Sequence, residues 1–149
     1  MGSRFRKAAP IGLPVQLMQL KQTYGDLIIK SHIKGNTLSC TMLLTPSLAS
    51  ATYKVLITYK LSEFSPRSWL IEPIIESHKD KNLEHVYGFD AKGHPRLCVY
   101  DPKTNEWTGQ MLLATSYVPW IVTWLNAYEY WMITNKWIYP AISHRKKKE

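Results

Sequence analysis

Apolar and polar side chains alternate along two stretches in the first half of the chain. Residues 37–44 carry Leu38, Cys40, Met42 and Leu44 on one face, and residues 53–60 alternate in the same way. A period of two is typical of half-buried β-strands. The pattern therefore predicts two strands and places Cys40 in the core, where we assign it no chemistry.

Two further extended stretches flank this pair. Residues 27–33 precede it, separated by a tight turn at residues 34–36, and residues 68–75 follow it. Pro73, near the end of the last stretch, indicates that this strand lies at an edge of the sheet or ends there. Together the four stretches predict an antiparallel four-stranded meander.

A helical period precedes the meander. Pro14 fits the first turn of a helix that Gly25 ends, because proline lacks only an N–H that this turn leaves unused. The apolar stripe of this helix consists of Val15, Leu17, Met18, Leu20 and Tyr24.

A longer helix follows in the second half of the chain. Its apolar stripe runs, at helical spacing, through Tyr117, Ile121, Trp124, Tyr128 and Trp131. Thr115 or Ser116 can cap it, Pro119 fits its first turn, and regular structure ends at Asn135 and Pro140. An aromatic stripe of this kind predicts a helix packed on the sheet.

Residues 76–97 show no convincing strand or helix period. A polar run leads into a short apolar piece at residues 83–89. A long irregular segment inside a compact domain is usually functional, and the alternative is a surface loop anchored by one aromatic side chain. The order of helix, four-stranded meander, irregular segment and long helix predicts an α+β fold.

One candidate for chemistry stands directly after this segment, in the run GHPRLCVYDPKTNEW. Cys98 lies in a short apolar stretch between two clusters of turn-forming residues, which predicts a brief extended piece near the surface. Lys92, His94 and Arg96 precede it, and neighbouring cations favour the reactive thiolate. The alternative is a buried cysteine that acts as a small hydrophobic residue.

Length and cysteine usage narrow the class of protein. The 149 residues fit one domain, which we place at residues 13–140, with a flexible lead at 1–12 and a basic tail at 141–149. Two cysteines on different elements form neither a disulfide framework nor a zinc pattern, which favours a reducing cytosol and implies no metal or cofactor. No apolar run is long enough to predict a membrane span.

The net charge of +8 comes mainly from the two ends of the chain. Between Ala8 and His144 there are 12 basic and 10 acidic residues, so the body carries only +2. A nucleic-acid-binding fold carries a basic stripe on its body. We therefore predict no nucleic-acid partner and interpret the ends as solvated tails.

The element order and the residues around Cys98 resemble a known family. The order is similar to that of the ubiquitin-conjugating enzyme fold, whose catalytic cysteine follows a four-stranded meander and an irregular loop. The run HVYGFDAKGHPRLCVYDPKTNEWTGQMLLATSYVPWIVTWLNAYEYW resembles the ubiquitin-conjugating-like proteins of prokaryotic antiphage operons (CBASS, cyclic-oligonucleotide-based antiphage signalling), closest to the stand-alone kind encoded without an activating enzyme. The resemblance covers nearly the whole chain and is most specific between His85 and Trp137.

The resemblance implies roles for individual residues. Cys98 matches the catalytic cysteine, which accepts a protein's carboxyl terminus as a thioester and passes it to an amine. Trp107 matches a tryptophan that we interpret as packing. Eukaryotic members carry a His-Pro-Asn signature whose asparagine supports the oxyanion, but here His94-Pro95 is followed by Arg96 and the asparagine is absent.

That departure leaves the groups around the thiol to be assigned. His94 is the best candidate for moving the proton or stabilising the oxyanion, with a backbone N–H as an alternative and His85 as a weaker candidate. Asp101 could orient an attacking lysine amine, or it could be the turn residue of an Asp-Pro pair.

The resemblance implies a transferase that forms a thioester with the C-terminus of a cGAS-like nucleotidyltransferase and promotes its conjugation to an unidentified amine. The missing His-Pro-Asn signature leaves a second class open, a docking module that binds the nucleotidyltransferase without transfer. A thiol hydrolase is less supported, because no separate His and Asn or Asp pair stands out as its triad.

Overall fold

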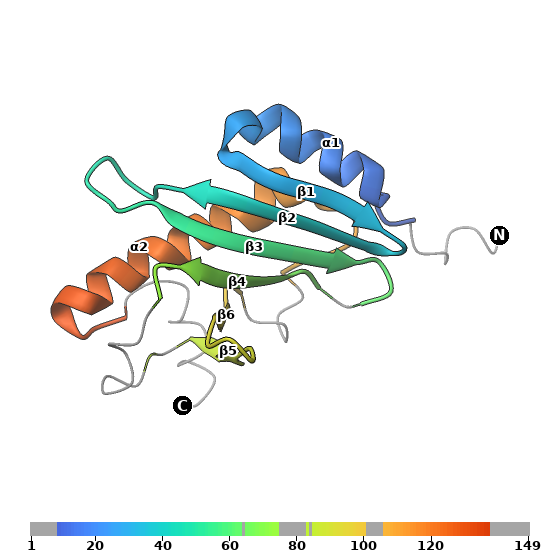
Figure 1. Cartoon of the computed structure of the whole chain (residues 1–149). Coiled ribbons are helices and arrows are strands. Elements are labelled where there is room, and N and C mark those ends of the chain that lie inside the picture. The colour runs from blue at the N-terminus through green and yellow to red at the C-terminus, as the bar shows by residue number, and fades with distance from the viewer. Residues whose placement is uncertain (1–8, 64, 75–82, 84, 101–105, 138–149) are drawn as a thin grey trace.

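The structure of the chain is a computed structural model that describes residues 9–63, 65–74, 83, 85–100 and 106–137. These residues form an α+β fold, as predicted: two helices cover one face of an antiparallel sheet (Figure 1). In chain order the elements are α1 (Leu13–Tyr24), β1 (Ile28–Lys34), β2 (Thr37–Leu44), β3 (Tyr53–Lys60), β4 (Arg67–Glu72), β5 (Val86–Phe89), β6 (Pro95–Leu97) and α2 (Val118–Thr134).

The predicted meander is present, with β2 and β3 at the predicted bounds. Strands β1 to β4 pair consecutively and antiparallel. Every second residue of β2 and β3 is buried: Leu38, Cys40, Met42 and Leu44 on β2, and Tyr53, Val55, Ile57 and Tyr59 on β3. The assignment of Cys40 to the core is confirmed, since its side chain is fully buried.

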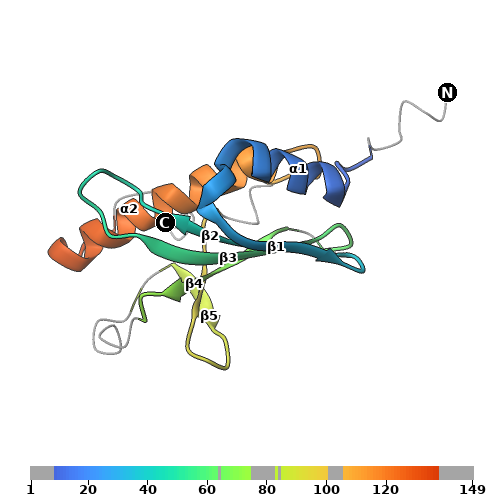
Figure 2. The same ribbon diagram turned by 45° about the horizontal axis from the view of Figure 1, so that its top comes forward.

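The sheet is larger than predicted. It has six strands in the order β1-β2-β3-β4-β6-β5, because the described part of the expected irregular segment folds into the β5–β6 hairpin. β4 pairs with β6 through Trp69 and Arg96, so it is not an edge strand, and Pro73 lies just beyond its end. The hairpin projects from the sheet on the side away from the helices (Figure 2).

The β5–β6 hairpin was not predicted from the sequence, for a physical reason. β5 and β6 have four and three residues, and their register shifts between Val86 and Phe89. Gly88 (φ 133°) and Gly93 (φ 87°) adopt backbone conformations that other residues rarely reach. Strands this short show too few alternations to reveal a period.

Helix α2 buries the aromatic stripe that the sequence predicted. Tyr117, Ile121, Trp124, Tyr128 and Trp131 are all buried, and Asn135 ends the helix in the left-handed conformation. The predicted caps are wrong: Thr115 and Ser116 lie inside a π-helical turn, Leu113–Tyr117, which leads directly into α2. No side chain caps α2, although Pro119 occupies its first turn as predicted.

Helix α1 has the predicted ends and part of the predicted stripe: Leu20 is fully buried, and Leu17 and Tyr24 pack against the core. Pro14 lies in the first turn and Gly25 is the C-cap. The buried residues are Leu13, Gln16 and Leu20, whereas Val15 and Met18 of the predicted stripe are exposed. Gln16 is fully buried because its amide donates to Met111 O and accepts from Leu113 N–H, both at 2.8 Å.

Part of the predicted lead is held against the domain. The N–H of Ile11 donates to Gly109 O at 2.8 Å. A Cβ on residue 109 would lie 2.8 Å from the Cβ of Pro10, so only glycine permits this close approach. The tail at 141–149 lies outside the described residues, and neither described helix has the length and apolar character needed to cross a bilayer.

Candidate active site

Cys98 lies directly after β6 and is held there through its backbone. Its N–H donates to the carbonyl oxygen of His85 at 3.0 Å. The same carbonyl accepts the indole N–H of Trp124, also at 3.0 Å. One oxygen therefore fixes the cysteine backbone to helix α2 in the core.

His85 adopts an uncommon conformation to make both contacts. Its φ is 61°, a left-handed value that few residues other than glycine adopt. The imidazole ring lies against Trp137, with ring centroids 5.1 Å apart. The role that the structure supports for His85 is positional, since its backbone carbonyl holds the residue that carries the thiol.

The thiol of Cys98 contacts groups from the hairpin and from the turn that follows. Its Sγ–H donates to Tyr100 O, with a sulfur–oxygen distance of 3.7 Å. The Tyr87 hydroxyl donates to the same oxygen at 3.2 Å and lies within hydrogen-bonding reach of the Cys98 side chain. Sulfur, phenol and carbonyl oxygen thus form one polar cluster, which we call the thiol cluster.

Burial and charge keep the phenol of this cluster protonated. Burial is the main reason that the pKa of Tyr87 is raised, and the hydrogen bond to Cys98 raises it further. Arg96 opposes this, because its guanidinium lies 4.7 Å from the centre of the Tyr87 ring and favours the phenolate. The pKa of Tyr87 nevertheless stays above its usual value, so the hydroxyl remains a donor at neutral pH.

The structure places His94 away from the thiol. Its Nδ1 lies 2.9 Å from Asp90 Oδ2, and its side chain lines a groove on the open face of the sheet. Because β6 is extended, the residues from His94 to Cys98 span on the order of 13 Å. His94 pairs with Asp90, and Arg96 is the expected cation whose guanidinium lies over the Tyr87 ring of the thiol cluster.

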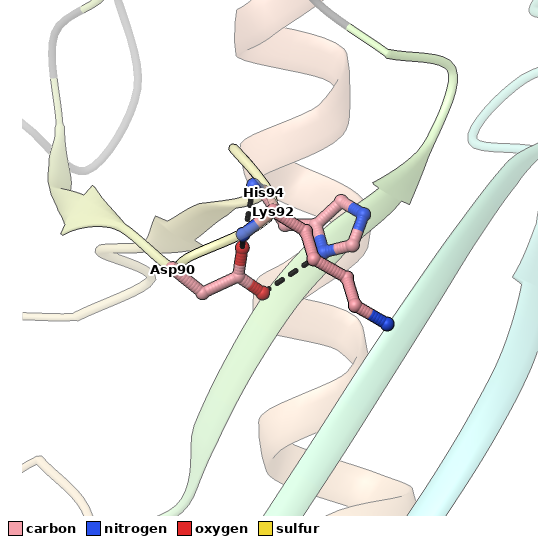
Figure 3. A network of polar contacts seen from close by, with 3 residues as sticks. All are labelled: Asp90, Lys92 and His94. Atoms are coloured by element: carbon pink, nitrogen blue, oxygen red, sulfur yellow. Dashed lines mark hydrogen bonds and ion pairs between the residues drawn. The ribbon is translucent and has the colours of Figure 1, made fainter.

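The Asp90 carboxylate holds the turn between β5 and β6 so that the His94 side chain lies on the open face of the sheet. Its Oδ1 accepts the backbone N–H of Lys92 and of His94, each at 2.9 Å, as Figure 3 shows. Burial alone would raise the pKa of Asp90, but the bonds from His94 and Lys92 outweigh it and lower the pKa. Asp90 therefore stays ionised and fixes both the turn and the imidazole.

Two further residues that the sequence singled out are Asp101 and Trp107. Asp101 lies outside the described residues. Trp107 packs as predicted: it is buried and makes edge-to-face contacts with Tyr59 and Tyr117, with centroids 5.6 and 6.0 Å apart. These contacts anchor Trp107 to β3 and to the start of α2.

Cys98 itself is less accessible than the sequence indicated. Its exposed fraction is 8%, so the prediction of a near-surface thiol is wrong. The reason is the hairpin, since Tyr87 comes from the neighbouring strand and contacts the side chain. Tyr87 was missed because no local pattern relates residue 87 to residue 98 until β5 and β6 pair.

No curated protein matches the chain. A family model described as "Type II CBASS E2 protein" matches residues 16–145, which include α2, the β5–β6 hairpin and the whole thiol cluster. Because that match spans most of the sequence, the chain belongs to the family of type II CBASS E2 proteins.

Proposed function

We propose that the chain has the ubiquitin-conjugating enzyme fold and is a cysteine-dependent transferase. In this proposal Cys98 forms a thioester with the C-terminus of a cGAS-like nucleotidyltransferase and passes it to an amine, which primes antiphage signalling. Membership of the type II CBASS E2 family supports an E2-like role. The thiol cluster is the single observation that carries the assignment, because it surrounds Cys98 with oriented polar groups and leaves Cys40 in an apolar core.

The proposed chemistry proceeds in two steps. In the first, the Cys98 thiolate attacks the carbonyl carbon of an activated form of the partner's C-terminal carboxyl. The activating group leaves with its electron pair, and a thioester remains. In the second, an amine attacks that carbonyl, the carbon–sulfur bond breaks, and the amine loses a proton as the amide forms. Cys98 is then free to react again.

In both steps negative charge develops on the sulfur and on the acyl oxygen, and the thiol cluster can stabilise it. In the ground state the thiol donates to Tyr100 O. Once the thiol has lost its proton, the Tyr87 hydroxyl can turn from that carbonyl to the sulfur or to the acyl oxyanion, because its raised pKa keeps it a donor. Tyr87 thus takes the role that we assigned to His94 from the sequence.

Asp101 keeps its proposed role as the group that orients the attacking amine. This rests on its place three residues after Cys98. A carboxylate there would hold a lysine ammonium close to the thioester and accept its proton as it attacks.

A docking module without transfer is the second candidate, and one observation favours it. The exposed fraction of Cys98 is only 8%, so an acyl group reaches the sulfur only after a neighbouring side chain moves. Tyr87 is the side chain that can do so, since it contacts the sulfur while 45% of its surface is exposed. The transferase proposal therefore requires Tyr87 to move during loading.

Co-expression with the nucleotidyltransferase separates the two functions. We expect a covalent adduct in the wild-type protein that survives denaturing electrophoresis and is cleaved by excess thiol. Cys98→Ala should abolish the adduct, and Cys40→Ala, which removes the other thiol, should retain it.

A pull-down from the same cells completes the test. If the wild-type protein captures the nucleotidyltransferase but never carries it covalently, while phage protection persists in Cys98→Ala, the docking module replaces the transferase.

A further inference from the structure

The face of the sheet opposite the helices carries a groove that the proposed reaction does not use. Its volume is about 690 Å³. Aliphatic side chains from three strands form its floor: Ile29 on β1, Leu56 on β3 and Ile71 on β4. The rim carries Lys30 from β1, and Lys92 and His94 from the turn between β5 and β6.

Two irregularities in the strands shape the floor. In β1 the register shifts between Ile28 and Lys30, which makes Ile29 the extra residue. In β4 it shifts opposite Lys54 and Val55, which makes Ile71 the extra residue. A β-bulge re-aims side chains and is frequent beside functional sites. Here the bulge in β1 lets the consecutive residues Ile29 and Lys30 both line the groove.

The turn of the hairpin provides one wall. Figure 3 shows Lys92 and His94 projecting from this turn over the strands, on the opposite side of the sheet from α2. The Asp90 carboxylate holds the imidazole of His94 and the backbone of both residues in place. The wall is therefore built into the fold.

The charge of the groove is positive and partly uncompensated. Among the described residues, no carboxylate lies within ion-pair distance of Lys30 or Lys92. A third lining lysine, Lys54, pairs with Glu72 at 3.4 Å. The lining carboxylate of Asp90 pairs with His94 at 2.9 Å, so it does not neutralise Lys30 or Lys92. Free ammonium groups beside an aliphatic floor complement carboxylates that flank an aliphatic side chain.

The residues that line the groove disfavour nucleic acid as its ligand. Among the described lining residues there is no Phe, Tyr or Trp on which a base could stack. The body of the chain carries only +2, without the basic stripe that tracks a phosphate backbone.

We propose that this groove binds an acidic segment of a partner protein in which carboxylates flank aliphatic residues. The aliphatic side chain lies on Ile29, Leu56 and Ile71. Ile29 is 50% exposed in the free chain, so its contact with the partner removes apolar surface from water. The carboxylates pair with Lys30 and Lys92. This binding is non-covalent and independent of the reaction at Cys98.

Fluorescence anisotropy of the full chain tests the proposal without an acyl donor, so that no thioester can form. The probe is a labelled short peptide of alternating Glu and Leu, with a Lys–Leu peptide of the same length and a single-stranded oligo-dT as competing probes. We expect the Glu–Leu peptide to bind most tightly. Lys30→Glu and Lys92→Glu should each weaken it about tenfold, as reversal of one ion pair does. Lys21→Glu, the same change on α1, is the matched control.

Three results would overturn the proposal. These are equal binding of the two peptides, tighter binding of oligo-dT, and equal effects of Lys21→Glu and the two groove variants. Circular dichroism of each variant ensures that loss of binding is not loss of fold.

Discussion

Tyr87 and Cys98 belong to different strands, and the β5–β6 hairpin brings the phenol to the thiol. Eleven positions along the chain separate them, yet they share the acceptor oxygen of Tyr100. Alternation was enough to place Cys40 correctly, because a buried face repeats every second residue. It could not find the partners of Cys98, because these depend on the pairing of two very short strands.

Tyr87→Phe tests whether the hydroxyl contributes to the reaction. It removes one donor from the thiol cluster and keeps the ring beside Arg96, so the fold should persist. We expect single-turnover loading of Cys98 to slow by roughly 10²-fold, as for loss of one oxyanion donor. Tyr130→Phe, at a comparably exposed tyrosine of α2, is the control and should load normally. Loading of Tyr87→Phe at the wild-type rate would remove Tyr87 from the mechanism.

We expect the free energy of unfolding to fall at alkaline pH because of the buried thiol of Cys40. Burial raises the pKa of its thiol from the ordinary value of 9.0 to about 11, with Lys21 opposing. The folded state thus holds the proton that the unfolded state loses, so the stabilisation is complete below pH 9 and is lost as the pH rises towards 11.

Chemical denaturation from pH 8 to pH 11, in reductant, measures this effect. The free energy of unfolding of the wild-type protein should fall more steeply above pH 9 than that of Cys40→Ala, by up to roughly 2 kcal/mol. The tyrosines titrate in both proteins and cancel in the comparison. Parallel curves would contradict the assignment of Cys40 to a dry core.

At the scale of elements, long periodic segments were predictable and short ones were not. β2, β3 and α2 bury the faces that the sequence indicated. Helix α1 follows its pattern only in part: Leu20 of the predicted stripe is buried, but so is the polar Gln16, whereas Val15 and Met18 are exposed. The Gln16 amide satisfies two backbone groups of the segment that enters α2, a reason that no hydrophobic pattern can reveal.

Gln16→Met measures what the two hydrogen bonds of the Gln16 amide, which we call the Gln16 clamp, contribute to stability. Methionine keeps the volume but leaves Met111 O and Leu113 N–H buried without the amide. We expect the free energy of unfolding to fall by about 2–4 kcal/mol. Gln22→Met, at an exposed position of the same helix, should change it by less than about 0.5 kcal/mol. Equal effects of the two substitutions would mean that the clamp is not important for stability.

At the scale of the molecule, the two-layer arrangement separates two surfaces. Both helices cover one face of the sheet, so the opposite face is open and carries the groove with His94. Cys98 lies where the hairpin meets α2, held by His85 O and Trp124. The sequence placed His94 with the thiol because the two are close along the chain, whereas the extended β6 separates them.

Intact mass measurement of the protein co-expressed with the nucleotidyltransferase tests the transferase most directly. The wild-type protein should gain the mass of the partner chain less one water, and excess free thiol should restore the original mass by cleaving the thioester. Cys98→Ala should never gain that mass, and Cys40→Ala should gain it fully. A Cys98→Ala protein that still carries the partner covalently would show that Cys98 does not form the linkage.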